Sequence, residues 1–315
     1  MKSKKIVLAA LLLGAASALP TAHGADKPKV FAIVPKSISV AFYADVERGC
    51  KEEGKKLGVQ VIYTGPDTAD ASKQVQILQD LVSRGVDGFA VAPMDADSVI
   101  GVIDAALKKG IKVITFDSDS PKSKRISFVG TNNGEGGKEA GKAFKGMLPK
   151  GKFAVLTGGL AAANHNERGE GFREILKGGE YTEIPGSPFP CNDDAAKSIQ
   201  IIQDTLTRYP DLEGFFFSGG WPLFGAPEAY IRALGKRKDD VKAKKFVVVS
   251  FDSLPEELKL LKQGYCNALV GQRPYQMGVK SVDVLNDLAA GKEVPKVIDT
   301  GVDVITAENV GQFLK

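Results

Sequence analysis

The sequence predicts an α/β protein made of two similar halves in tandem, each built on a parallel β-sheet. Short apolar, β-branched runs alternate with amphipathic helical stretches, at roughly 25–30 residues per strand–helix unit. A repeat is the second observation, since residues 112–121 and 246–255 each end an apolar run in Phe-Asp-Ser and reach a proline. Ligands of open α/β sheets bind outside the carboxyl ends of the strands. The two turns therefore predict two halves that face one ligand.

Residues 1–24 have the pattern of a secretory signal peptide. Three lysines precede an apolar run over residues 6–18, and the small-x-small motif Ala22-His23-Gly24 precedes Ala25. A membrane anchor is the alternative, but the apolar run is short for a membrane span. No cysteine directly follows the run to carry a lipid. We expect cleavage near Gly24–Ala25 and export of the mature protein.

Composition and charge narrow the class of protein. The 315 residues are 43% hydrophobic and 25% charged, which is an ordinary globular composition for a chain long enough to form two domains. Without the three lysines of the leader, the formal net charge falls from +4 to +1. A near-neutral chain offers no electrostatic footprint for nucleic acid, so no nucleic-acid partner is expected.

Three cysteines remain, at positions 50, 191 and 266. Cys50 lies in an amphipathic helical stretch, which indicates a small buried side chain. A disulfide between Cys191 and Cys266 is left open, because the sequence does not place their Cα atoms. No Cys-x-x-Cys motif and no cysteine/histidine cluster indicates a metal site.

In the first half, glycines at positions 58, 85 and 110 end the three expected helices. The helix before Gly85 carries its apolar residues at helical spacing. Strands are expected over residues 30–34, 59–63, 88–92, 113–116 and 126–130, and helices over residues 44–57, from the polar cap segment 67–72 to Gly85, and over residues 96–109.

The alternation restarts after a break near Gly130–Asn132. The last helix has no strand left to pair with in the second half, so the chain is expected to return to the first half through several hinge strands. Strands are expected over residues 153–157, 181–184, 215–218, 246–251 and 268–270, helices over residues 135–147, 169–177, 194–209, 227–234 and 276–290, and a loop over residues 164–168.

Asp117 and Asp252 are the first candidates for ligand contacts. An ionised carboxylate accepts hydrogen bonds in a fixed plane, which suits the adjacent hydroxyls of a polyol. The repeated motif favours a ligand role over the alternatives, an ordinary loop residue or a helix N-cap. Asp119, two residues before Pro121, is better explained as a cap or turn residue.

Aromatic side chains stand near the same predicted strand ends. Phe42 and Tyr43 follow the first strand, and Trp221, the only tryptophan, follows the strand at residues 215–218. Aromatic faces can stack on the C–H faces of a sugar ring. The alternative is that the rings belong to the hydrophobic core.

Polar side chains complete the predicted site. Asn166 and Arg168, in the segment Asn164-His165-Asn166-Glu167-Arg168, are candidate hydroxyl-binding residues, although Arg168 can instead pair with a neighbouring glutamate. Gln272 is a candidate because an amide both donates and accepts hydrogen bonds, whereas Arg273 is a weaker one. His165 is the only histidine after cleavage, and a lone histidine is weak evidence for catalysis.

Motifs of nucleotide-binding and hydrolytic enzymes are missing. The glycine-rich segment 134–138 lacks P-loop spacing, and no Gly-x-Gly-x-x-Gly follows the first strand. A Gly-x-Ser-x-Gly nucleophile elbow is also absent. We therefore expect no cofactor, no catalytic residue and no metal.

Taken together, these segments resemble the periplasmic solute-binding proteins of the ribose/galactose type, which serve ABC importers. The resemblance extends over nearly the whole mature chain, and its order and spacing are more specific than any single motif. The matching segments are Phe42-Tyr43, Leu81-Val82-Ser83-Arg84-Gly85-Val86-Asp87-Gly88, Val113-Ile114-Thr115-Phe116-Asp117, Glu167-Arg168-Gly169-Glu170-Gly171-Phe172, Val249-Ser250-Phe251-Asp252 and Gln272-Arg273-Pro274-Tyr275-Gln276-Met277-Gly278.

The resemblance implies the type I periplasmic binding protein fold, with two Rossmann-like lobes and a three-segment hinge. The N-terminal lobe would comprise residues 25–130 and 273–300, and the C-terminal lobe residues 131–272 and 301–315. Ligand would lie between the lobes, in contact with Phe42, Tyr43, Asp117, Ser118, Asn166, Arg168, Trp221, Asp252 and Gln272.

The departures from the ribose pattern argue against ribose itself. Val40-Ala41 replaces an Asn-Pro pair, and Ser118 and Asn166 stand where ribose receptors carry arginines. Gly219 stands where they carry an asparagine, and Trp221 is expected to fill volume beside it. We expect another neutral monosaccharide, a sugar alcohol or a cyclitol.

The expected function is capture of such a solute and its delivery to the membrane permease of an ABC importer by a monomeric protein. A receptor that presents its ligand to a chemotaxis or signalling sensor is an alternative that the sequence does not separate from this one. A secreted carbohydrate-active enzyme is a further alternative, because Asp117 and Asp252 resemble a glycosidase pair. A sugar-responsive regulator of the LacI class would need a helix-turn-helix where the leader stands.

Overall fold

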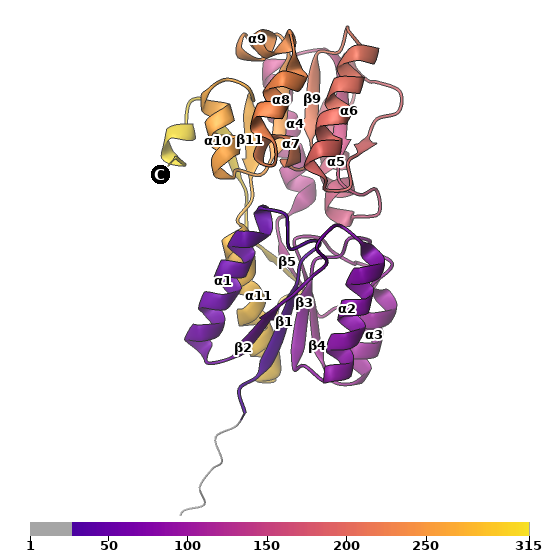
Figure 1. Ribbon diagram of the computed structural model, residues 1–315, viewed down its shortest axis with the longest axis vertical. Coiled ribbons are helices and arrows are strands. Elements are labelled where there is room, and N and C mark those ends of the chain that lie inside the picture. Colours follow the sequence, from indigo (N-terminus) through magenta and orange to yellow (C-terminus); the bar gives the residue numbers. More distant parts are fainter. Residues whose placement is uncertain (1–26, 315) are drawn as a thin grey trace, which may run out of the picture.

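The computed structural model describes residues 27–314 and has two α/β lobes stacked end to end (Figure 1). The predicted signal peptide, residues 1–24, lies outside the described residues. Within residues 27–314, no helix is both long and apolar enough to cross a membrane.

The first lobe contains a six-stranded sheet in the order β12-β5-β4-β3-β1-β2, in which every pairing is parallel. Its edge strand β12 comes from near the end of the chain, after most of the second lobe. The strands are β1 (Val30–Val34), β2 (Gln60–Tyr63), β3 (Gly88–Val91), β4 (Lys112–Phe116), β5 (Ser127–Gly130) and β12 (Val297–Asp299).

Helices cover both faces of this sheet (Figure 1). Alternate residues of a strand point to opposite faces, so β1 sends Phe31 and Ile33 into one core and Ala32 and Val34 into another. The first core is covered by α1 (Phe42–Leu57) and α11 (Pro274–Ala289), and the second by α2 (Ala71–Arg84) and α3 (Ile100–Lys108).

The second lobe contains a seven-stranded sheet in the order β13-β11-β10-β9-β6-β7, with β8 paired to β6. All pairings are parallel except that of β13 with β11, which is antiparallel. The strands are β6 (Gly151–Thr157), β7 (Tyr181–Glu183), β8 (Phe189–Pro190), β9 (Gly214–Phe217), β10 (Val247–Phe251), β11 (Ala268–Gly271) and β13 (Asp303–Thr306).

The helices of the second lobe also form two layers. One core lies under α4 (Asn133–Met147) and α5 (Ala163–Leu176) and contains the stacked rings of Phe172 and Phe216, whose centroids are 4.3 Å apart. The other core is covered by α6 (Ala195–Arg208), α7 (Trp221–Phe224), α8 (Pro227–Leu234), α9 (Arg237–Lys242), α10 (Pro255–Lys262) and the 3-10 helix η1 (Val310–Gln312).

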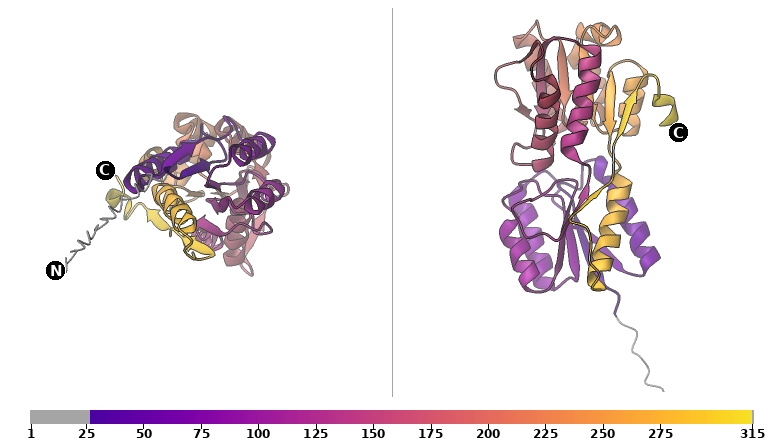
Figure 2. Two further views of the ribbon diagram at one scale, coloured as in Figure 1. Left: turned by 90° about the horizontal axis from the view of Figure 1, so that it is seen from below. Right: turned by 180° about the vertical axis from the view of Figure 1, so that it is seen from behind.

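The chain passes between the sheets three times, from β5 to α4, from β11 to α11 and from β12 to β13 (Figure 2). Side chains tie these crossings together. Thr131 Oγ1 donates to Gln272 Oε1 over 3.0 Å, and the backbone N–H of Asn132 donates to Asp299 Oδ1 over 3.1 Å. Arg273 forms an ion pair with Asp303 at 2.9 Å.

The two lobes are closed on each other. The backbone N–H of Ala96, in the first lobe, donates to the carbonyl of Ala161, in the second lobe, over 3.0 Å. Lys36 Nζ, which follows β1, donates to Asn164 Oδ1 of α5 over 2.9 Å and is buried. Residues at the strand ends of both sheets are thereby brought into one enclosed region.

The predicted fold class is confirmed, but several elements differ from the expectation. The loop expected over residues 164–168 is the first part of α5, and Trp221 begins the short helix α7 rather than lying in a loop. Helices α9 and α10 and the strands β12 and β13 were not expected. The disulfide left open does not form, since Cys191 and Cys266, like Cys50, are buried unpaired thiols.

Candidate functional site

Asp117 and Asp252 occupy equivalent positions in the two lobes. Each is the first residue after a central strand, and each has a positive φ, 56° for Asp117 and 75° for Asp252. In each case the backbone N–H still bonds to the neighbouring strand, at Val129 O and Val270 O respectively, both over 3.0 Å. Aspartate tolerates this left-handed conformation better than most residues do. The repeated backbone turn therefore holds both carboxylates at the carboxyl edges of the sheets.

A pocket lies between the lobes at these edges. The pocket is lined by Lys36, Val40, Phe42, Tyr43 and Asp117 from the first lobe, by Asn164, His165, Arg168, Asp193, Gly219, Trp221, Phe224 and Asp252 from the second lobe, and by Gln272 from a hinge crossing.

The aromatic pair of the first lobe opens helix α1. The rings of Phe42 and Tyr43 meet edge to face, with centroids 5.2 Å apart. Tyr43 donates its hydroxyl to Asp117 Oδ2 over 2.7 Å. Burial, and then the charge of Asp117, raise the pKa of Tyr43 well above its usual value, so the phenol remains a donor. The pair therefore combines an apolar surface with a fixed orientation of Asp117.

Arg168 is the central cation of the site and is only 1% exposed. Its guanidinium donates to Asn133 Oδ1, Ser218 O and Gln272 Oε1 over 2.9, 2.8 and 2.6 Å and lies 4.2 Å from the centre of the Phe251 ring. It also lies 3.9 Å from Asp117 Oδ1, across the cleft. Because protein partners fix the guanidinium group, Arg168 supplies a rigid positive charge near the carboxylates of Asp117 and Asp252.

The carboxylate of the second lobe is held by two donors. Gln272 Nε2 donates to Asp252 Oδ1 over 2.7 Å, and the backbone N–H of Gly220 donates to Asp252 Oδ2 over 3.1 Å. Burial raises the pKa of Asp252, while the charge of Arg168 and these two donors oppose the rise. Each oxygen of Asp252 keeps a lone pair available for a further donor.

Trp221 is buried against the site, and its indole lies over Gly219. A Cβ at position 219 would come within 2.5 Å of the indole carbon Cη2, so only glycine leaves the ring in place. The other side of the indole meets His165, with ring centroids 5.2 Å apart. Trp221 is thus a wall of the pocket as well as part of the core of the second lobe.

Two predicted residues are not brought into the pocket. Asn166 is exposed, and its amide donates to Leu160 O over 2.9 Å. Since α5 begins at Ala163, Asn164 and Arg168 lie one turn apart on the same face of the helix, whereas Asn166 points away from them. Ser118 is buried in the turn after β4 and does not line the pocket.

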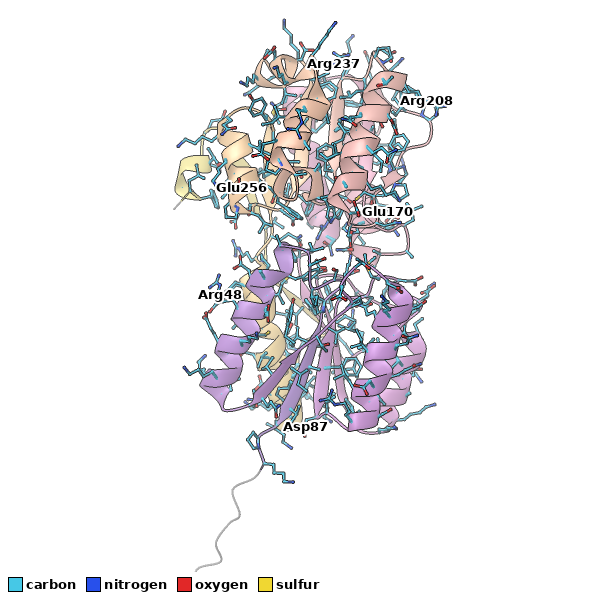
Figure 3. All side chains as sticks on the ribbon, viewed as in Figure 1. Arg48, Asp87, Glu170, Arg208, Arg237 and Glu256 are labelled. Atoms are coloured by element: carbon cyan, nitrogen blue, oxygen red, sulfur yellow. The ribbon has the colours of Figure 1, made fainter. Side chains whose placement is uncertain are left out.

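The weaker candidates have structural partners. Asp119 forms an ion pair with Arg125 at 2.5 Å and accepts from Thr115 Oγ1 over 2.6 Å. Arg273 pairs with Asp303 at the hinge. Surface cations such as Arg48 and Arg237, labelled in Figure 3, lie on the outer faces of the lobes and pair with Asp45 and Asp240. The charges of the pocket form a separate, buried group.

Sequence reasoning missed Lys36 and Asp193 and did not select Asn164. Lys36 follows the first strand, so its position at a strand end was a usable signal. Asp193 precedes α6 in an irregular, proline-containing segment where no periodicity marks the side chain as inward-facing. Among residues 27–314, no group of three or more histidine, cysteine or acidic side chains is arranged to hold a metal ion.

Comparisons with known proteins agree with this architecture. Residues 31–293 match the model of the periplasmic binding protein domain family. The ribose import binding protein of Salmonella typhimurium is 28% identical over 93% of this chain and 95% of its own.

Two solved structures extend the comparison. A solute-binding protein of an ABC transporter from Burkholderia graminis, solved in complex with D-arabinose, is 37% identical, with a TM-score of 0.82 over 92% of this chain and 99% of its own. A glucose-galactose binding protein from Geobacillus stearothermophilus is 29% identical, with a TM-score of 0.81 over 90% of this chain and 99% of its own. The chain therefore belongs to the periplasmic binding protein family.

Proposed function

We propose that this protein binds a neutral, unphosphorylated monosaccharide, sugar alcohol or cyclitol between its lobes and delivers it to the permease of its importer. The observation that carries the proposal is the placement of Asp117 and Asp252, one from each lobe, in the lining of one pocket between the lobes. A polyol donates hydroxyl protons to both carboxylates and rests its C–H faces on Phe42 and Trp221.

The charges of the pocket favour a neutral ligand. Three carboxyl groups, Asp117, Asp193 and Asp252, stand against two cations, Lys36 and Arg168. His165, which also lines the pocket, is neutral, because burial and the nearby Lys36 lower its pKa to about 4. A phosphate or carboxylate on the ligand would add a negative charge to a buried site that already holds three acidic groups.

Closure of the lobes is the step that ligand controls. Three residues of the first lobe contact the second lobe, namely Lys36, Ala96 and Asp117, and a bound ligand would add contacts to both lobes. Ligand favours closure only by its greater affinity for the closed form. The closed protein then presents a joint surface of both lobes to the permease.

We assign the lobes to residues 25–130 with 273–300 and to residues 131–272 with 301–315. The sheet memberships support this division, since β12 pairs with β5 of the first sheet and β13 pairs with β11 of the second. The three crossings between the sheets would act as the hinge.

Export is the remaining part of the proposal. The charged start, the apolar run and the motif Ala22-His23-Gly24 support cleavage near Gly24–Ala25. The intact mass of the protein recovered from the periplasm of an expressing bacterium tests this site. A mass that matches a chain beginning at Met1 would contradict it.

A thermal-shift screen tests the ligand class. The protein is unfolded, refolded to strip any bound solute, and heated with D-ribose, D-arabinose, D-allose, D-galactose, sugar alcohols, inositols, ribose 5-phosphate and amino acids. A ligand at about a thousand times its Kd stabilises the folded state by about 4 kcal/mol, which raises Tm by several degrees. Stabilisation by neutral polyols alone is expected. Stabilisation only by ribose 5-phosphate or amino acids would contradict the proposed class.

A further inference from the structure

Three buried residues of the pocket form a cluster, namely Lys36, His165 and Asp193. Lys36 is 2% exposed and reaches across the cleft, where its Nζ donates to Asn164 Oδ1 over 2.9 Å and approaches His165 Nε2 to 3.3 Å. An ammonium carries three donors, so one N–H of Lys36 remains after these two contacts. All three members of the cluster line the pocket.

The contacts of His165 fix its tautomer. Lys36 can only donate, so Nε2 is the unprotonated acceptor and Nδ1 carries the proton. That assignment fits the other side of the ring, where Nδ1 lies 3.2 Å from Ser218 Oγ, which in turn donates to Thr157 Oγ1 over 3.1 Å. His165 is therefore neutral, and the lone pair of its Nε2 accepts from Lys36.

Asp193 is left without a donor by this arrangement. Its Oδ1 lies 3.5 Å from His165 Nε2, but that nitrogen has no proton to give. Oδ1 is fully buried and has no hydrogen-bond partner, and no donor to either oxygen of Asp193 is found among residues 27–314. Burial acts to raise the pKa of Asp193, whereas the positive charge of Lys36 lowers it and so favours the anionic carboxylate. A buried carboxylate without a donor is costly unless a ligand supplies one.

We propose that Asp193, with Lys36, is a specificity-determining site for one ligand hydroxyl, which donates to the carboxylate and accepts from the ammonium. This inference rests on the proposed function and names a third point of recognition beside Asp117 and Asp252. At those two, Tyr43, Gln272 and Gly220 already donate to the carboxylates. Asp193 has no such donor, so it depends most on the ligand.

The chemistry selects ligands that carry a free hydroxyl at this cluster. A deoxy or O-methyl analogue leaves Asp193 unpaired, and a phosphate brings a second anion to it. Close packing restricts the site further, because a Cβ on Gly158 would lie 2.4 Å from Asp193 Oδ1 and 2.6 Å from His165 Nε2. The carboxylate is thus held in place by shape as well as by charge.

The test is a cycle of variants and sugar analogues, measured by titration calorimetry. The variants are Asp193→Asn, which keeps the shape and the tolerance of the positive φ of 60°, and Lys36→Met. Asp204→Ala, an exposed carboxylate on α6 of the same lobe, is the matched control. The probes are D-arabinose, D-ribose, D-allose and D-galactose, each with its singly deoxygenated analogues. Unliganded melting curves confirm that each variant folds.

The wild-type protein and Asp204→Ala are expected to lose affinity about tenfold to a hundredfold for one deoxy analogue of the sugar they bind best. In Asp193→Asn the parent sugar loses a similar factor, and the penalty for that one analogue disappears. A purely structural role for Asp193 would weaken parent and analogues alike. Lys36→Met is expected to weaken all probes, because it also removes the contact with Asn164.

The possible failures are distinguishable. If the wild-type protein binds none of the four sugars, the proposed function fails and this inference fails with it. If the wild-type protein binds one of them and Asp193→Asn binds parent and analogues with unchanged affinities, the inference is overturned and the proposed function stands. The same holds if every analogue penalty persists in Asp193→Asn.

Discussion

At the scale of single residues, the pocket is organised by which groups are neutral and which are charged. His165 is neutral because burial, and then the positive charge of Lys36, lower its pKa, and the same charge of Lys36 favours the anionic form of Asp193. Arg168 holds its place through three protein partners, so it does not have to be ordered by ligand. This fixed pattern of donors and acceptors makes a neutral polyol the best match.

The depressed pKa of His165 predicts a loss of stability in mild acid. The unfolded chain binds a proton at histidine near pH 6.5 and the folded protein only near pH 4, so unfolding is favoured as pH falls between these values. The loss contributed by this residue is about 3 kcal/mol, from about 1.4 kcal/mol per unit. Urea melts from pH 7.5 to 4.5 give the free energy of unfolding of the wild-type protein and of His165→Asn as two curves against pH. The difference between the two curves is the contribution of His165. Parallel curves would contradict the assignment of a neutral His165.

Glu257 is predicted to affect stability with the opposite pH dependence to that of His165. It is fully buried, its Oε1 has no partner, and burial raises its pKa well above the usual value. The folded protein then holds a proton that the unfolded chain releases, so this carboxyl costs stability as pH rises above about 4.3. Glu257→Gln, uncharged in both states, is expected to melt above the wild type at pH 7.5, with a difference that shrinks toward pH 4. A lower Tm at pH 7.5 would show that Glu257 is ionised.

At the scale of secondary-structure elements, the strands of the two sheets were predictable and the ends of helices were less so. Central strands such as β4 and β10 are continuous apolar runs that end in the repeated Phe-Asp-Ser turn, and both were expected almost to the residue. Helix α5 was placed six residues too late. Its N-cap, Ala162, makes no side-chain cap bond, and its first turns are rich in asparagine and glycine, so no local signal marks the start.

The late start predicted for α5 explains why Asn166 was chosen as a candidate ligand residue. If residues 164–168 formed a loop, as expected, Asn166 could point into the pocket as readily as Asn164. Helical spacing instead pairs Asn164 with Arg168 in the pocket and leaves Asn166 exposed. Strands β12 and β13 were missed for a different reason, because they are three and four residues long and exist only through pairing with strands distant in the chain.

The turn before α7 carries a prediction of its own. Gly219 leaves room for the indole of Trp221, and a methyl group there would meet its ring at 2.5–2.6 Å. Gly219→Ala is expected to displace Trp221 and lower sugar affinity about tenfold or more, since a shift of one pocket wall disturbs both lobes' contacts. Because Trp221 is the only tryptophan, its fluorescence reports the displacement directly.

Gly146→Ala, on α4 with open space around its Cα, serves as the control. It is expected to leave both the emission spectrum and the affinity unchanged. An unchanged spectrum and affinity in Gly219→Ala would mean that the indole does not form a wall of the site.

At the scale of the whole molecule, the fold stacks two similar lobes end to end and connects them by three crossings of the chain (Figure 2). The polar contacts that bridge the lobes include the Ala96–Ala161 backbone bond, the contacts of Lys36 with Asn164 and His165, and the approach of Asn164 and Arg168 to Asp117. These contacts must break when the protein opens to release its ligand, so closure depends also on the ligand's own contacts.

The central claim is that one neutral sugar is held by a carboxylate from each lobe. The most direct measurement is titration calorimetry of the stripped wild-type protein, Asp117→Asn and Asp252→Asn with the neutral sugar that stabilises the wild type most. The account predicts that each variant folds and loses affinity about tenfold or more, because each removes an ionised acceptor from the same ligand. Wild-type affinity in either variant would contradict the claim that the sugar binds a carboxylate of each lobe.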